Sequence, residues 1–408
     1  MVKRNTSKFK ISNGVYLDYA ATTPIDPGVL KAMLPYLKER YGNPSTIYSL
    51  GEEAEIAIDK ARKNLAKFLN CQPEEIIFTG SATEANNLAI KGLIKAVRNS
   101  QPTIKPHIIT TMIEHHAVLE PLKALEKEGA ETTYLPVNKN GLINISDLAK
   151  AIKENTVLVS VMYANNEIGS TQPLAQIGKL IKHINNLKEK SGNLKTYFHT
   201  DAVQAINYLD CNVNRLGVDL LALSAHKIYG PKGVGALYIR KGIPIEPQIY
   251  GGGQESGLRS GTENVAGIVG LGTAINKIKS QKSKIKIIEK LRNRLIKGIL
   301  AEIPDAQLNS PPQNSLPNIV NFSFPGAEGE AIVLDLSRMN IFVSTGSACS
   351  SKSLEPSHVL ISLGLTEEEA HSSIRFSLGR NTTQQEIDFV LKILPGVVER
   401  FRKISGYK

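Results

Sequence analysis

Cysteine is scarce in this chain of 408 residues. The three cysteines, Cys71, Cys211 and Cys349, are an odd number and show no CxxC spacing. A disulfide framework uses paired cysteines, and a zinc site uses ligands that lie close together in the sequence. The sequence therefore argues against both, predicts no resident metal, and leaves one of the three cysteines as a candidate reactive thiol.

A long apolar run is also missing. No stretch is apolar enough to span a bilayer, and the first fourteen residues carry four lysines and arginines without an apolar core. We therefore expect neither a membrane protein nor a secreted one, and a cytoplasmic location follows. A hydrophobic content of 41% and a charged content of 21% are typical of a globular protein. A chain of this length favours one large domain with a smaller one.

The net charge of +11 is concentrated in one segment. Residues 277–297 contain nine lysines and arginines and a single acid, Glu289. Apolar residues recur here at three- and four-residue steps, which predicts one helical stripe with the lysines outside it. These apolar residues are Ile275, Ile278, Ile285, Ile288, Leu291, Leu295 and Ile299. We interpret the segment as a solvated helix face and expect no nucleic acid partner, with an acidic partner or tRNA as the alternative.

Short β-rich runs alternate with helical patterns from about residue 50 to residue 300. The runs are 75–79, 107–111, 131–137, 156–163, 195–201, 218–224 and 235–240. This alternation predicts an α/β fold with a mainly parallel sheet covered on both faces, and ligands beyond the carboxyl ends of its strands. We predict a large domain over 15–300 and a smaller α+β domain over 301–408, on which the segment 15–40 partly packs.

Lys227 is the most informative residue. It follows the apolar run 218–223 and precedes a glycine-rich segment. A lysine that ends a buried strand is partly desolvated, so its amine can be neutral and nucleophilic near pH 7. Asp201 follows another strand-like run. Pyridoxal phosphate uses a lysine for its Schiff base and an aspartate beside its pyridine nitrogen, so the pair predicts this cofactor. A lysine at a strand end is, taken alone, more often a solvated charge.

Polar residues follow three further strands. The segment 80–87 opens a helix, where backbone N–H groups and Thr83 could hold a phosphate. His115 could stack on the pyridine ring, and Asn166 could donate to the cofactor or to a substrate carboxylate. Each has a structural alternative, namely a helix N-cap, a satisfied histidine and an Asn-rich turn.

Three features of the C-terminal half add to this set. The glycine-rich, polar segment 251–264 is either a flexible loop or a phosphate-binding loop that acts across a subunit interface. Cys349 lies in a run of small residues, which suits a nucleophile that travels to its target. Arg375 stands in an otherwise apolar strand and could bind an amino-acid carboxylate through two parallel hydrogen bonds. A structural ion pair is the alternative for Arg375.

Taken together, these motifs make the chain resemble a cysteine desulfurase of the NifS/IscS type, within the class V aminotransferases. The resemblance extends nearly end to end, and it rests on the ordered set of segments 16–24, 42–45, 224–227, 346–349 and 375–380, which is specific as a set. It implies the fold of aspartate aminotransferase, which is fold type I of the pyridoxal phosphate enzymes. In this fold a large domain carries a mainly parallel seven-stranded sheet, and a smaller α+β domain carries the cysteine loop. A homodimer is also implied.

The resemblance assigns roles to matching positions. Pyridoxal phosphate would be held by Ala82, Thr83, His115, Asn166, Asp201, Gln204, Ser224, His226, Lys227 and Thr262. Thr262 would come from the partner subunit. Asn166 and Arg375 would bind the substrate, and the catalytic residues would be Lys227, Cys349 and His115.

The implied activity converts L-cysteine to L-alanine. Sulfur would pass as a persulfide on Cys349 to an acceptor protein such as an iron–sulfur scaffold, and Cys349 could contact an iron–sulfur cluster transiently. A selenocysteine lyase and a class V aminotransferase are the enzymatic alternatives. A non-catalytic sulfur carrier or RNA-binding protein is the alternative of a different class, and it would need no complete cofactor set.

Overall fold

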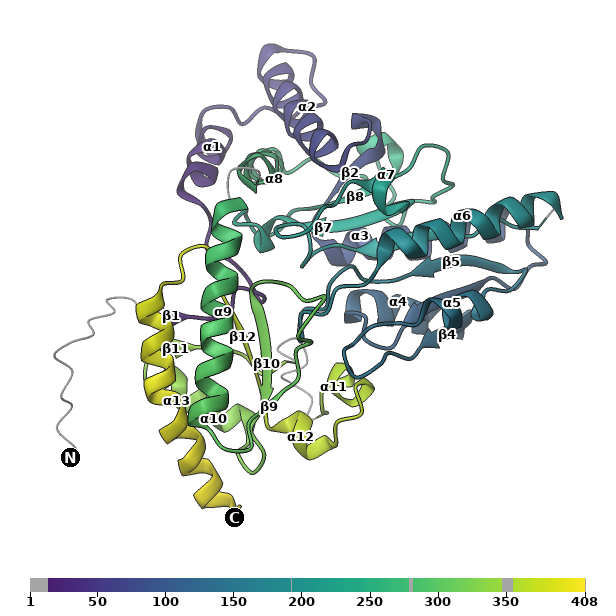
Figure 1. Ribbon diagram of the computed structural model, residues 1–408. Helices are drawn as coiled ribbons and strands as arrows, with labels where there is room; N and C mark the ends of the chain where they lie inside the picture. The colour runs from purple at the N-terminus through teal and green to yellow at the C-terminus, as the bar shows by residue number, and fades with distance from the viewer. Residues whose placement is uncertain (1–13, 192, 279–281, 347–354, 408) are drawn as a thin grey trace.

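The larger part of the molecule is built around one seven-stranded sheet (Figure 1). The computed structural model describes residues 14–191, 193–278, 282–346 and 355–407. The spatial order is β2-β8-β7-β6-β5-β3-β4. The strands are β2 (Ile76–Thr79), β3 (His107–Thr111), β4 (Glu131–Leu135), β5 (Thr156–Ser160), β6 (Tyr197–Asp201), β7 (Leu220–Ser224) and β8 (Gly235–Ile239). Strand β8 runs antiparallel to β2 and β7, and the other pairs are parallel. The prediction of a mainly parallel seven-stranded sheet is confirmed.

Helices bury both faces of this sheet, which is why the residues of β2, β3, β5, β7 and β8 are buried throughout. Along β7, Leu221 and Leu223 join one hydrophobic cluster, whereas Leu220 and Ala222 join another, as the two-residue period of a strand dictates. The second cluster includes α3 (Ala82–Ser100) and α4 (His116–Lys127). The first includes α1 (Pro27–Lys38), α2 (Ser49–Leu69), α5 (Ile145–Ala151), α6 (Leu174–Lys190), α7 (Val213–Leu216) and α8 (Val265–Ile278). Among the described helices, none is both long and apolar enough to cross a membrane.

The C-terminal part has its own small sheet (Figure 1). It also has its own hydrophobic cluster. Three antiparallel strands lie in the order β12-β10-β9, namely β9 (Gln307–Leu308), β10 (Ile319–Ser323) and β12 (Ser373–Ser377). The helices here are α9 (Lys282–Glu302), α10 (Gly329–Arg338), α11 (His358–Ser362), α12 (Glu367–His371) and α13 (Gln384–Ser405). Strand β1 (Val15–Tyr16) pairs in parallel with β11 (Ile341–Phe342). The start of the described chain therefore packs on its C-terminal part.

The basic segment 277–297 is divided between two helices, α8 and α9. Ile275 packs in the core of the large sheet, whereas Ile288 packs with the C-terminal part. The prediction of one continuous stripe is therefore wrong, because the seven-residue step from Ile278 to Ile285 fits a break as well as two helical turns. Since α9 packs with the C-terminal part, we propose a domain boundary ahead of α9 in place of one at residue 300.

Candidate active site

A cavity of about 370 Å³ lies where the parallel strands of the large sheet end. Its lining includes these residues predicted from the sequence: Ala82, Thr83, His115, Asn166, Asp201, Gln204, Ser224, His226, Lys227 and Arg375. The cavity thus joins residues of the large sheet with Arg375 from the small one. Thr262 is exposed and does not line this cavity. Cys349 lies outside the described residues.

Asp201 is the last residue of β6, and two donors fix its carboxylate. Asn86 Nδ2 donates to Asp201 Oδ2 at 2.7 Å, and the backbone N–H of Val203 donates to Oδ1 at 2.9 Å. Asn86 is completely buried on α3. Hydrogen bonds that are buried in this way hold a carboxylate in one orientation. The geometry suits a carboxylate that must face a pyridine nitrogen.

Lys227 ends a short 3-10 helix, Ala225–Lys227, that follows β7 directly. Its Nζ donates to the backbone oxygens of Ala20 and Ala21 at 2.5 and 2.7 Å. Gln204 Nε2 also donates to the Ala20 oxygen, at 3.0 Å. The N-terminal segment therefore forms the wall of the cavity against which the lysine amine lies.

The turn between β2 and α3 is held tightly from behind. Ser81 is the N-cap of α3, and its Oγ accepts from the backbone N–H of Glu84 at 3.1 Å. Gly235 of β8 packs against the turn, where a Cβ would lie 2.6 Å from the Ser81 carbonyl carbon and 2.9 Å from the Ala82 nitrogen. Ala82 and Thr83 then present the positive end of the helix dipole to the cavity. Such a turn is fit to receive a phosphate.

Two histidines of the cavity, His115 and His226, favour their neutral form. His115 is the N-cap of α4, and its Nδ1 accepts from the backbone N–H of Ala117 at 3.1 Å, so a neutral ring carries its proton on Nε2. Burial lowers the pKa of His115, although the nearby Asp201 opposes this shift. Burial also lowers the pKa of His226 to about 4. A neutral imidazole at either position can donate or accept a hydrogen bond without adding charge.

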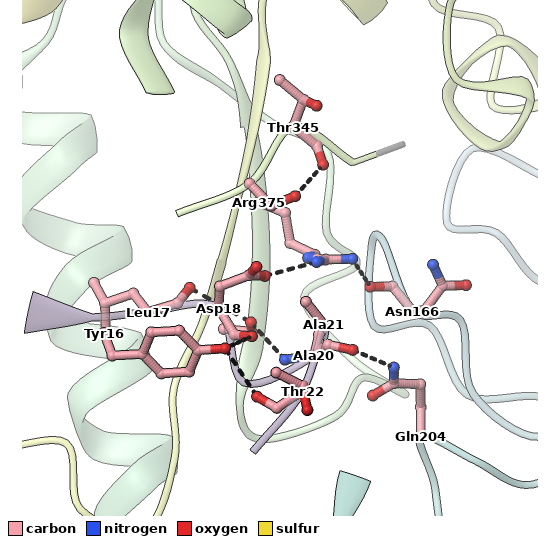
Figure 2. Close-up of polar contacts among 12 residues, drawn as sticks. Tyr16, Leu17, Asp18, Ala20, Ala21, Thr22, Asn166, Gln204, Thr345 and Arg375 are labelled. Carbon is pink, nitrogen blue, oxygen red and sulfur yellow. Dashed lines mark hydrogen bonds and ion pairs between the residues drawn. The ribbon is translucent and has the colours of Figure 1, made fainter. Parts of the chain in front are cut away.

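Arg375 forms the structural ion pair that was its alternative, and its role as a carboxylate ligand stays a prediction (Figure 2). Its side chain lines the cavity and is only 3% exposed, and one terminal nitrogen pairs with Asp18 Oδ1 at 2.8 Å. The other terminal nitrogen donates to the backbone oxygen of Asn166 at 3.0 Å. Its Nε has no hydrogen-bond partner among the described residues. Asp18 and the Asn166 oxygen therefore align the planar guanidinium fork of Arg375, which keeps donor capacity for a carboxylate.

Sequence reasoning missed Asn86, Asp18 and Glu167. Asn86 lies one helical turn beyond Ala82 and Thr83, so the 3.6-residue period of α3 could have placed it beside them. Glu167 lines the cavity and accepts a hydrogen bond from the Ser357 hydroxyl at 2.6 Å. Only the three-dimensional fold brings Asp18 to Arg375. With these additions the described residues fit pyridoxal phosphate, since phosphate, pyridine nitrogen and aldehyde each meet a suitable group.

Comparison with known proteins agrees with this geometry. The family model described as Aminotransferase class-V matches residues 15–390. "Cysteine desulfurase IscS" of Dictyoglomus turgidum is 50% identical over 395 residues, which is 97% of each chain. A solved "NIFS-LIKE PROTEIN" is 40% identical with a TM-score of 0.87, covering 95% of this chain and 100% of that one. The structure "SspA in complex with cysteine" is 38% identical with a TM-score of 0.77, covering 90% and 100%.

The fold and the match over most of the chain define the class. The chain belongs to the class V aminotransferase family and has its α/β fold. Within that family it is a member of the cysteine desulfurases, since curated relatives of that name match nearly the full chain at 44–50% identity.

Proposed function

We propose that the protein uses pyridoxal phosphate to convert L-cysteine into L-alanine and transfers the sulfur to Cys349. The observation that carries the proposal is the meeting of Lys227, Asp201 and Arg375 in one cavity. The first two suit the cofactor, and the arginine suits an amino-acid carboxylate. A solved relative is named as a complex with cysteine, which supports this substrate. L-cysteine and the Cys349 thiol together give L-alanine and a persulfide, so the reaction needs no external oxidant.

The cavity offers a group for each part of the cofactor. When bound, pyridoxal phosphate supplies an electron sink for negative charge at the substrate Cα. Ala82, Thr83, Ser224 and His226 would hold its phosphate, together with Thr262 of the other subunit. His115 would lie on the face of the ring and Asp201 against its nitrogen. Asn166 and Gln204 would contact the side of the ring that bears the hydroxyl group.

Lys227 and Arg375 would divide the work on the substrate. Arg375 would hold the carboxylate, which fixes the direction of the Cα–H bond relative to the lysine. The Lys227 amine would take the Cα proton, and the oxygens of Ala20 and Ala21 would stabilise the resulting ammonium. Cys349 as a thiolate would attack the substrate sulfur, so that an S–S bond forms while the Cβ–S bond breaks and leaves its electron pair on the substrate. A proton at Cβ, and return of the Cα proton from Lys227, would complete alanine. The persulfide would then pass to an acceptor such as an iron–sulfur scaffold protein.

A homodimer completes the proposal. On α1, Val29 and Met33 pack against the core, whereas Leu30, Leu34 and Leu37 form a second apolar stripe that is exposed. An exposed stripe of this kind is typical of a surface that a second copy covers. Thr262 is exposed as well, so one subunit could supply it to the cofactor phosphate of the other. We propose a cytoplasmic location for this dimer.

The test follows both products. Purified protein with L-cysteine should form alanine in step with persulfide, and mass spectrometry should place that sulfur on Cys349. Borohydride should fix the cofactor to Lys227, and Lys227→Ala should abolish the label. Cys349→Ser should keep the cofactor but release no sulfide. Sulfide release from Cys349→Ser at the wild-type rate would contradict the role of Cys349, and a keto-acid product would favour an aminotransferase.

A further inference from the structure

Glu255 anchors the start of the loop 254–264 to the large sheet. Its carboxylate accepts two hydrogen bonds from the guanidinium of Arg62 on α2, at 2.8 and 3.0 Å. The same carboxylate accepts from the backbone N–H of Phe78 in β2 at 2.8 Å. The Glu255 side chain is 3% exposed and that of Arg62 18%. A bidentate pair that is nearly buried fixes direction as well as distance.

The backbone at this anchor adopts a conformation that is unfavourable for its residues. Glu255 has φ 49° and Ser256 has φ 56°, both in the left-handed region that favours glycine. Such conformations persist where the surroundings determine them, and they cluster at functional segments. The contacts of Glu255 therefore hold the loop in a shape that its sequence alone would not favour.

Arg259 forms a second anchor further along the loop. Its Nε donates to Glu84 Oε1 at 2.8 Å, and the other oxygen of Glu84 accepts from the backbone N–H of Gly80 at 2.8 Å. Glu84 lies in the first turn of α3, beside the proposed phosphate turn. Both anchors thus fix the loop to the strand, turn and helix that begin with β2.

Thr262 follows these two anchors in the sequence, and its position indicates what they do. It is exposed and lies outside the cavity of its own chain, whereas its neighbour Ser260 is buried. We propose that Glu255 and Arg259 are positioning residues, which hold the loop so that Thr262 reaches the cofactor phosphate of the partner subunit. This inference rests on the homodimer and cofactor of the proposed function. It predicts that damage to the Glu255 anchor weakens cofactor binding in the other subunit and spares its own.

Mixed dimers with separate affinity tags on their two subunits test this directly. Lys227→Ala restricts borohydride labelling to one subunit, so labelled Lys227, measured by mass spectrometry during dilution, gives the rate at which that subunit loses pyridoxal phosphate. In the cis dimer, one subunit carries Glu255→Gln and the other Lys227→Ala. In the trans dimer, one subunit carries both substitutions and the other is wild type. A dimer of wild-type and Lys227→Ala subunits is the reference.

The trans dimer should lose the cofactor about tenfold faster than the reference, as expected for one weakened charge-assisted contact, and the cis dimer should match the reference. Arg62→Gln, which removes the guanidinium that holds Glu255, should repeat the pattern if Glu255→Gln folds poorly. Glu128→Gln, which removes the charge of the surface pair with Arg98, is the control. In place of Glu255→Gln, it should leave the rate of cofactor loss in both dimers equal to that of the reference. Loss in the trans dimer that is no faster than in the cis dimer overturns the inference. A monomer in light scattering, or no label on wild-type Lys227, would instead contradict the proposed function.

Discussion

Arg375→Ala should discriminate against substrates that carry a carboxylate. The wild-type fork is aligned by Asp18 and by the Asn166 oxygen, and the arginine side chain is only 3% exposed (Figure 2). A charge-assisted bidentate contact with a carboxylate is worth about 1.5–3 kcal/mol, or roughly one to two decades in affinity. Cysteine binding should therefore weaken by about 10- to 100-fold, while binding of cysteamine, which lacks the carboxylate, should change little.

The assay measures dissociation constants for both compounds through the absorbance of the bound cofactor, in a Cys349→Ser background that prevents turnover. Arg375→Lys should restore little of the cysteine affinity, because an ammonium lacks the planar fork. Asp18→Asn is the control, since it removes the charge of the ion pair but keeps an acceptor for the guanidinium. It should lower the stability and keep most of the preference for cysteine. Equal weakening of cysteine and cysteamine by Arg375→Ala would refute the role of the arginine.

Three further predictions follow from burial and close packing. Burial raises the pKa of Glu114 to about 8, from 4.5. The free energy of unfolding of the wild type should therefore fall relative to that of Glu114→Gln as the pH rises from about 4.5 to 8. The loss should be at most about 1.4 kcal/mol per pH unit. Burial lowers the pKa of His107 to about 4, so this histidine should destabilise the fold as pH falls from about 6.5 to 4, and His107→Gln should remove that dependence in denaturant titrations. Gly235→Ala should cost about 1–3 kcal/mol, because its Cβ would meet the Ser81 backbone. Titration of Gly235→Ala with pyridoxal phosphate should show weaker binding than in the wild type. An unchanged affinity would contradict the account of the phosphate turn.

The sheet could be predicted because buried parallel strands leave a strong local signal. Each expected run contains the observed strand, but some were drawn too long: 131–137 ends at Leu135, and 156–163 ends at Ser160. Beyond Ser160, Val161 and Met162 are buried, whereas beyond Leu135, Pro136 is exposed and Val137 half-buried. Hydrophobic pattern reports burial, and after β5 burial continues past the end of the strand. The chain direction of β8, by contrast, depends on tertiary pairing that no local pattern records.

Site residues could be predicted from the sequence where the signal lies in a short segment, and not where it depends on contacts between distant segments. Asp201 ends one strand and Lys227 lies just after the next, so the rule that ligands bind at the carboxyl ends of the strands brings them to one edge. The pairing of Asp18 with Arg375 joins residues 357 positions apart, and each looks ordinary in its own segment. Whether Arg375 serves as a clamp or as an ion pair was therefore open from the sequence. The fold shows that the ion pair is what aligns the fork.

The N-terminal segment ties these two halves of the site together. Strand β1 pairs with β11 in the C-terminal part, and Asp18 reaches Arg375 from there. A few residues later the oxygens of Ala20 and Ala21 accept from Lys227 on the large sheet. The lysine and the arginine stand on different hydrophobic cores, so their separation depends on how those cores pack. A short segment bonded to both side chains fixes that separation. In the proposed function, this separation would set where a substrate held by its carboxylate presents its Cα–H bond.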